Sequence, residues 1–151
     1  METIRWGIVG PGNIAARFAQ AVKGIPFAEL TAVASRDGDR GAAFAETHQI
    51  PHVFTGYEAM AASNLVDAVY IATPHPFHAP CAELFLKAGK HVLCEKPFAP
   101  TVAEAQELVN IAKEKGLFLF EAITTAHHPH YAQVKQWLPQ LGNLKTVICT
   151  Y

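Results

Sequence analysis

Five short apolar runs recur along the 151-residue chain, and the stretches between them carry helical patterns. The runs are rich in Val, Ile, Leu and Phe, and they cover residues 4–10, 29–35, 67–73, 91–94 and 117–122. They lack the strict alternation of a strand with one wet face, so they are typical of parallel strands buried on both faces. Strand and helix in repeated alternation predict an α/β fold with a doubly wound parallel sheet between two helical layers.

The helical stretches have recognisable ends. Helices are predicted over 13–23 and about 77–88, each followed by a glycine. The clearest helix lies within 101–116, where Thr101 as N-cap and Glu104 three residues later form a capping box. Its predicted apolar face consists of Val102, Ala105, Leu108, Val109 and Ala112.

Charge and cysteine content narrow the class of partner. Lys and Arg number 12 against 13 Asp and Glu, with no basic run, which argues against nucleic acid and anionic membranes and favours a small molecule. Cys81, Cys94 and Cys149 have no CxxC spacing, so neither a disulfide framework nor a zinc site is expected, and a reducing, cytoplasmic location fits. The N-terminal apolar run is too short for a signal peptide or a membrane span.

The sequence "GPGNIA", residues 10–15, lies between the first apolar run and the first helix. It fits the dinucleotide fingerprint G-x-G-x-x-G/A with alanine in the third place. Gly10 would permit the tight turn and Gly12 the close approach of a pyrophosphate, to which the amides of Asn13 and Ile14 would donate. The alternative is a glycine-rich turn that binds no ligand.

The end of the second run predicts the choice of dinucleotide. An NAD site usually offers an acidic residue to the ribose there, but this chain has Ser35 and Arg36, which suit a 2′-phosphate. NADP(H) is therefore favoured. NAD stays possible because a shift of one residue in the turn would present Asp37 instead.

The third run ends in "TPHPFH", which predicts a loop of Thr73, Pro74 and His75 beside the cofactor, with His78 at the start of the next helix. Two histidines three apart can bind a metal, as can the histidines of "HHPH" at 127–130. No further ligand stands at a familiar spacing, so no metal site is predicted.

Glu95 and Lys96 stand where the run 91–94 ends, before Pro97. Adjacent residues of a strand point to opposite faces, so the two side chains are expected to act separately. Ligands of open α/β sheets bind at the carboxyl ends of the strands. A lysine there can donate a proton to a carbonyl oxygen as hydride arrives at carbon, while Glu95 bonds the nicotinamide ribose or holds the lysine. The alternative is a surface ion pair.

Four stretches together resemble the glucose-fructose oxidoreductase and inositol dehydrogenase (Gfo/Idh/MocA) family, most closely its branch with dimeric dihydrodiol dehydrogenase and anhydrofructose reductase. They are "GIVGPGNIA", "AVASRD", "DAVYIATPHPFHAPCAELFLKAGKHVLCEKPFA" and "GLFLFEAITTAHHP". The resemblance implies a Rossmann-like domain of an NAD(P)-dependent oxidoreductase, usually a homo-oligomer, that acts on sugars, polyols or related diols. It also implies that Lys96 is catalytic at the cofactor. The implied cofactor site is lined by Gly10, Gly12, Ser35, Arg36, Thr73, Pro74, His75, His78 and Glu95.

The C-terminal part of the chain departs from this pattern. Residues 124–127, "TTAH", replace the aromatic and arginine usual in the branch, so its substrate is not carried over. Residues 1–122 are predicted to form the NAD(P)-binding domain. Residues 123–151 are predicted to hold the connecting helix, about 130–138, and the first strand, from Leu144, of a truncated second α/β domain for substrate and oligomer contacts.

Two other functions stay open. One is a non-catalytic NAD(P)-binding sensor or scaffold module. The other is an adenosylmethionine-dependent methyltransferase, which shares the glycine-rich first turn but requires an acidic residue where Ser35 and Arg36 stand.

Overall fold

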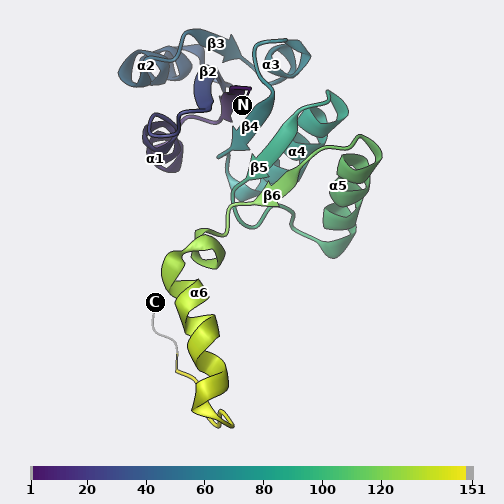
Figure 1. Ribbon diagram of the computed structural model, residues 1–151. Helices are drawn as coiled ribbons and strands as arrows, with labels where there is room; N and C mark the ends of the chain where they lie inside the picture. The colour runs from purple at the N-terminus through teal and green to yellow at the C-terminus, as the bar shows by residue number, and fades with distance from the viewer. Residues whose placement is uncertain (1, 149–151) are drawn as a thin grey trace.

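The computed structural model describes residues 2–148 and contains one sheet of six parallel strands in the order β3-β2-β1-β4-β5-β6 (Figure 1). The strands are β1 Ile4–Val9, β2 Ala28–Ser35, β3 His52–Thr55, β4 Ala68–Ile71, β5 His91–Cys94 and β6 Leu119–Glu121. The predicted doubly wound parallel sheet is confirmed. Its order reverses between β1 and β4, and in open α/β sheets such a switch point is where ligands bind.

Helices cover both faces of the sheet. On one face lie α1 Asn13–Val22 and α2 Gly38–His48; on the other lie α3 Glu58–Ala62, α4 His78–Lys87 and α5 Val102–Glu114. Each face has its own core, and β-strand residues alternate between them, with Ile8 on the α1 side and Val9 on the α4 side. The three-layer arrangement follows from this double burial.

The helix α5 begins as predicted but caps differently in detail. Thr101 Oγ1 accepts a hydrogen bond from the Glu104 amide at 3.2 Å, while the Glu104 carboxylate accepts from the Thr101 hydroxyl at 2.6 Å rather than from a backbone amide. Leu108 and Ala112 are buried as expected. Val102 is 86% exposed, because at about 3.6 residues per turn it lies about 120° around α5 from the buried Leu108.

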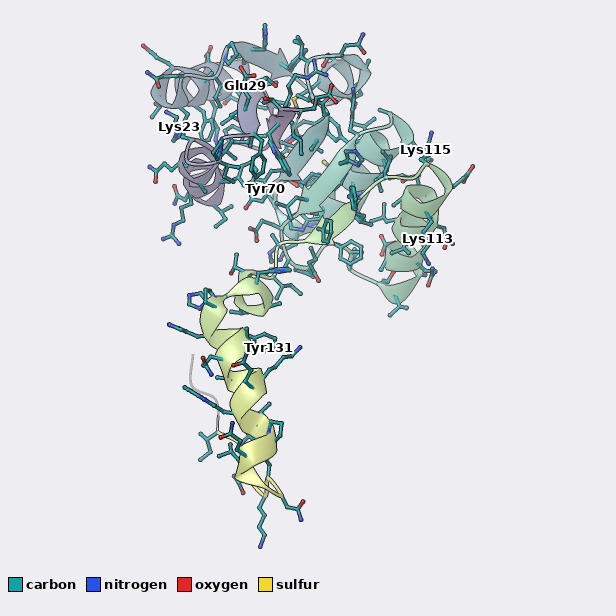
Figure 2. All side chains as sticks on the ribbon, in the orientation of Figure 1. Lys23, Glu29, Tyr70, Lys113, Lys115 and Tyr131 are labelled. Carbon is teal, nitrogen blue, oxygen red and sulfur yellow. The ribbon has the colours of Figure 1, made fainter. Side chains whose placement is uncertain are left out.

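The segment after β6 leaves the sheet. It consists of the turn η2 Thr124–His127, the helix α6 Pro129–Trp137 and the turn η3 Leu138–Leu141. Figures 1 and 2 show it extending away from the sheet, with Tyr131 on its exposed surface. The predicted helix is present. The predicted strand from Leu144 is not formed over 144–148, since no neighbouring strand pairs with these residues, and its remainder lies outside the described residues.

Candidate functional site

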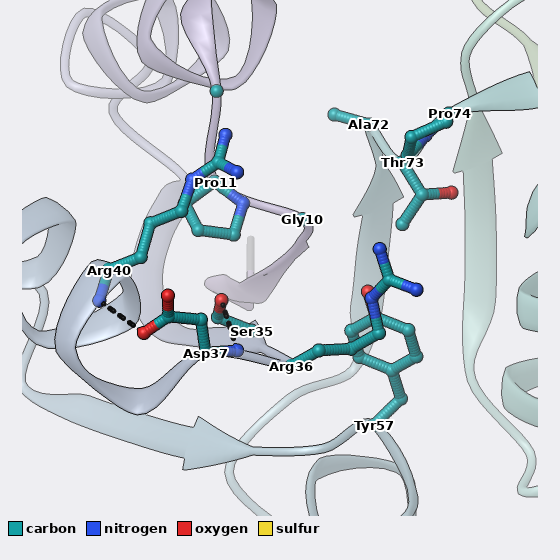
Figure 3. Close-up of a pocket in the computed structure, with 11 residues that line it drawn as sticks. Gly10, Pro11, Ser35, Arg36, Asp37, Arg40, Tyr57, Ala72, Thr73 and Pro74 are labelled. Carbon is teal, nitrogen blue, oxygen red and sulfur yellow. Dashed lines mark hydrogen bonds between the residues drawn. The ribbon is translucent and has the colours of Figure 1, made fainter.

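A cleft of about 280 Å³ opens at the carboxyl ends of β1, β2 and β4, at the switch point of the sheet (Figure 3). Six of the residues predicted to bind the cofactor line it. The lining residues are Gly10, Pro11, Gly12, Ser35, Arg36, Asp37, Arg40, Tyr57, Ala72, Thr73 and Pro74. Segments distant in the sequence therefore meet where the fold predicts a ligand.

The glycine turn after β1 has the geometry expected of it. Gly10 has φ +89°, and a Cβ there would lie 3.0 Å from Thr73 Cγ2, so both the turn and the approach of β4 require glycine. A Cβ on Gly12 would meet only Arg40 Nη2, at 3.7 Å. Packing within the chain therefore does not explain Gly12, whereas a ligand lying against the backbone does. The first-turn amides of α1, from Asn13 and Ile14 on, have no partner within the helix and suit an anion.

The end of β2 supplies the polar wall of the cleft. Ser35 is buried, and its Oγ accepts from the Asp37 amide at 3.2 Å. Arg36 is exposed, with its guanidinium carbon 4.7 Å from the centre of the Phe77 ring. Asp37 caps α2 by accepting from the Arg40 amide at 3.1 Å. The one acid of this turn is thus engaged as a helix cap, and two arginines face the cleft (Figure 3).

Arg40 and Tyr57 were missed by sequence reasoning. Both residues lie in or next to an element whose sequence has no strong apolar pattern. Arg40 lies in the first turn of α2, and Tyr57 comes just after β3. The only sequence signal was that a second arginine, Arg40, follows Arg36 by four residues. Burial raises the pKa of the Tyr57 phenol, so this side chain presents a protonated hydroxyl to the cleft.

The wall from β4 contains an unpaired polar atom. The Oγ1 of Thr73 is buried, and no residue within 2–148 forms a hydrogen bond with it. The hydroxyl has almost no accessible surface and lies beside the Cys81 thiol, whereas the methyl group of Thr73 is the part nearest Gly10. The open Gly12 turn and the two arginines are the features of the cleft that fit a dinucleotide.

The Glu95 carboxylate is held by a buried tyrosine, Tyr70. Its Oε1 accepts a hydrogen bond from the Tyr70 phenol at 2.6 Å. Tyr70 is buried and stacks on Phe18 of α1, with ring centres 4.1 Å apart, and Trp6 of β1 meets Phe18 edge-on at 5.3 Å. Burial, followed by the hydrogen bond to the Glu95 carboxylate, raises the pKa of the Tyr70 phenol. The Glu95 side chain is thus hydrogen-bonded to Tyr70 of β4.

Lys96 is exposed at the carboxyl end of β5, next to β4 in the sheet. Its amide donates to Glu95 Oε2 at 3.3 Å, and the Lys96–Pro97 peptide bond is cis. Its Nζ forms no hydrogen bond or ion pair with any residue within 2–148. The lysine therefore lies at the ligand edge of the sheet with its ammonium group free of the chain.

The two loop histidines are placed differently from each other. His75 is exposed, in the turn η1 His75–Phe77, and its ring centre lies 5.4 Å from that of His78. His78 is fully buried, with Nε2 2.7 Å from the Thr73 carbonyl oxygen and Nδ1 2.7 Å from the Pro97 carbonyl oxygen. Neither ring lines the cleft at Gly10, and direct cofactor contact by either stays a prediction.

Within residues 2–148, no cluster of three or more His, Cys, Asp or Glu side chains has the geometry to hold a metal ion, and no helix there is long and apolar enough to cross a membrane. Cys81 and Cys94 are buried free thiols. Burial raises the pKa of Cys81 to about 11 and also raises that of Cys94, so both stay protonated and unreactive.

Residues 4–123 match the family model of the Gfo/Idh/MocA proteins, an oxidoreductase family with an NAD-binding Rossmann fold. The chain belongs to this family. It is 40% identical over 148 residues to scyllo-inositol 2-dehydrogenase (NADP(+)) IolU of Bacillus subtilis, across 98% of this chain and 45% of that protein. It is 42% identical over 148 residues to trans-1,2-dihydrobenzene-1,2-diol dehydrogenase of Sus scrofa, across 95% of this chain and 44% of that protein.

A solved structure agrees with these relatives. KijD10, a 3-ketoreductase from Actinomadura kijaniata in complex with NADP, superimposes with a TM-score of 0.87 at 39% identity, over 92% of this chain and 44% of that one. The family resemblance read from the motifs is confirmed. The chain spans less than half the length of these relatives.

Proposed function

We propose that this chain is the nucleotide-binding domain of an NADP(H)-dependent oxidoreductase that transfers hydride to or from a sugar, polyol or related carbonyl substrate. The observation that carries the proposal is the cleft at the switch point, where Ser35, Arg36 and Arg40 lie beside the glycine turn and Asp37 is engaged as a helix cap. A relative named for NADP(+) and a structural neighbour solved with NADP support the same cofactor.

Different residues of the cleft bind different parts of the cofactor. When bound, the nicotinamide cofactor supplies or accepts the hydride. The Gly10–Gly12 turn and the amides of Asn13 and Ile14 hold the pyrophosphate, while Arg36 and Arg40 pair with the 2′-phosphate. Further along, Thr73, Pro74, His75 and Glu95 follow toward the nicotinamide end. NAD remains the second choice, since Arg36 and Arg40 would then face no phosphate.

Lys96 moves the proton. It lies after β5, next to the strand that carries Thr73, and its Nζ has no partner within the described part of the chain. A charged lysine in that place donates a proton to the substrate oxygen during reduction and takes it back during oxidation. We assign Lys96 the catalytic role for this reason.

The rest of the proposal concerns the whole protein. Residues 1–122 form the cofactor domain, and 123–151 begin a second domain that completes the substrate pocket and joins the subunits of a homo-oligomer. In support, α6 and η3 leave the sheet with apolar side chains such as Trp137 and Leu141 more than half exposed. A reducing, cytoplasmic location is proposed from the two buried free thiols.

Substitution of the proposed proton donor, Lys96→Met, tests the function. In the protein expressed from its complete reading frame and assayed with NADP⁺ and a panel of sugars and polyols, we expect turnover to fall at least about a thousandfold with little change in NADPH affinity. Lys113→Met on α5 is the matched control. Unchanged turnover would refute the role of Lys96, and a wild-type protein that binds NADPH but turns over no member of the panel would favour the sensor module.

A further inference from the structure

The Pro97–Phe98 peptide group, one residue beyond Lys96, is held at both of its ends by side chains. The Pro97 carbonyl oxygen lies 2.7 Å from His78 Nδ1, and the Phe98 amide donates to Glu121 Oε1 at 3.0 Å. One peptide unit thus accepts from an imidazole and donates to a carboxylate. Backbone groups in exposed loops more often bond to water, so two side-chain partners on one loop peptide indicate a specific restraint.

The two side chains come from different parts of the fold. His78 is the first residue of α4, and Glu121 is the last residue of β6, where it is paired in register with Cys94 of β5. Both are held by regular elements that pack in the core. The loop after β5 is therefore attached to a helix on one side and to the neighbouring strand on the other.

His78 also connects this loop to the cofactor cleft. Its second ring nitrogen, Nε2, lies 2.7 Å from the carbonyl oxygen of Thr73, whose side chain lines the cleft. A carbonyl oxygen can only accept, so in each of these two contacts the ring nitrogen is the donor when it carries the hydrogen. One fully buried side chain thus bridges the loop that contacts the cofactor and the loop that follows the proposed proton donor.

We propose that His78 and Glu121 are positioning residues, which clamp the Pro97–Phe98 peptide and thereby fix Lys96 relative to the cofactor cleft. This inference rests on the proposed function, in which Lys96 transfers the proton. On its other side Lys96 follows Glu95, which is held by the Tyr70 phenol at 2.6 Å. The backbone is thus restrained before and after Lys96, while its Nζ has no partner within 2–148 and can follow the substrate oxygen.

The size of the effect follows from the geometry of proton transfer. A donor must come within hydrogen-bond reach of its acceptor, and a displacement of about 1 Å can lower a rate about a hundredfold. A hydrogen bond to a carboxylate is stronger than one between neutral groups. Loss of the clamp is therefore expected to lower the rate of the chemical step without changing the residues that bind the nucleotide.

Two substitutions of nearly equal size separate the clamp from simple packing. Glu121→Gln keeps an oxygen that can accept from the Phe98 amide, whereas Glu121→Leu removes it. Glu114→Gln and Glu114→Leu, at an exposed position of α5, are the controls. In this chain without nucleotide, we expect Glu121→Leu to raise the exchange rate of the Phe98 amide about tenfold or more and to lower the NMR order parameters of residues 95–98, with Glu121→Gln close to wild type.

A kinetic measurement completes the test. In the protein from the complete reading frame, Glu121→Leu should lower kcat about tenfold to a hundredfold with an unchanged KM for NADPH, and Glu121→Gln should restore most of kcat. His78→Gln, which leaves one ring contact unmade, should act in the same direction. If His78→Gln does not fold, the Glu121 pair decides alone.

Either of two results would overturn the clamp: unchanged mobility at residues 95–98 in Glu121→Leu, or a uniform rise in amide exchange across the whole chain, which indicates lost stability only. These exchange and relaxation measurements use no nucleotide. Failure of the wild-type chain to bind NADPH would therefore refute the proposed function separately from the clamp.

Discussion

The phenol of Tyr70 donates a 2.6 Å hydrogen bond to Glu95 Oε1, and this bond joins β4, the first strand beyond the switch point, to the residue that precedes Lys96. Tyr70 is buried, and its ring stacks on Phe18 of α1. Glu95 is therefore oriented by a side chain that the core itself holds in place. The proposed proton donor begins from a fixed backbone position.

Tyr70→Phe tests that link. The substitution keeps the stack with Phe18 but leaves Oε1 of the half-buried Glu95 carboxylate without its donor. We expect the free energy of unfolding to fall by about 1–3 kcal/mol, measured by urea denaturation. Tyr131→Phe on exposed α6 is the control and should change it by less than about 0.5 kcal/mol. Equal stability of the two variants would show that the Tyr70 bond contributes nothing.

The same phenol predicts a pH dependence. Burial, with the Glu95 hydrogen bond as the second cause, raises the pKa of Tyr70 in the folded chain, so the folded state holds this proton more tightly than the unfolded state. The contribution is complete below the ordinary tyrosine pKa of about 10 and is lost as the pH rises above it. Urea midpoints measured from pH 8 to 11 should fall less steeply for Tyr70→Phe than for wild type. Parallel curves would contradict the shift.

Gly10 and Gly89 offer a matched pair for the glycine turn. Both have positive φ, +89° and +79°, but a Cβ on Gly10 would lie 3.0 Å from Thr73 whereas one on Gly89 would meet nothing within 4 Å. Gly89→Ala should therefore cost only the backbone strain of about 1–2 kcal/mol. Gly10→Ala should cost about 1–3 kcal/mol more by urea denaturation and weaken nucleotide binding. Equal costs would mean that Thr73 can move aside.

Arg40 tests the choice of nucleotide. Removal of its guanidinium by Arg40→Ala should weaken NADPH binding about tenfold or more, because a charged contact to phosphate is lost, and should leave NADH binding nearly unchanged. Arg17→Ala, on the exposed face of α1, removes the same charge outside the cleft. Nicotinamide fluorescence measures both affinities. An equal loss for NADPH and NADH would assign Arg40 to another part of the cofactor.

Elements that are buried on both sides were predicted, because their burial requires an apolar sequence. The strands β1, β2, β4, β5 and β6 were predicted because a parallel sheet covered on both faces needs continuous apolar runs. The strand β3 was not, because it is a short edge strand with three of its four residues exposed. The helix α3 has only five residues, too few for a helical period to show.

The candidate site was predicted to a similar extent. Gly10, Ser35 and Thr73 were placed together because motifs at the ends of parallel strands meet at one edge of the sheet. Arg40, Tyr57 and Glu121 were missed, since each acts through a contact between segments distant in the sequence. His78 was expected at the cofactor, but its buried ring joins two loops, which no spacing in the sequence could indicate.

Titration of this chain with NADPH and with NADH, followed by nicotinamide fluorescence, tests the central claim most directly. We predict saturable binding of NADPH at least about tenfold tighter than that of NADH, as two arginines beside Ser35 require. Absence of saturable NADPH binding at millimolar nucleotide would contradict the account.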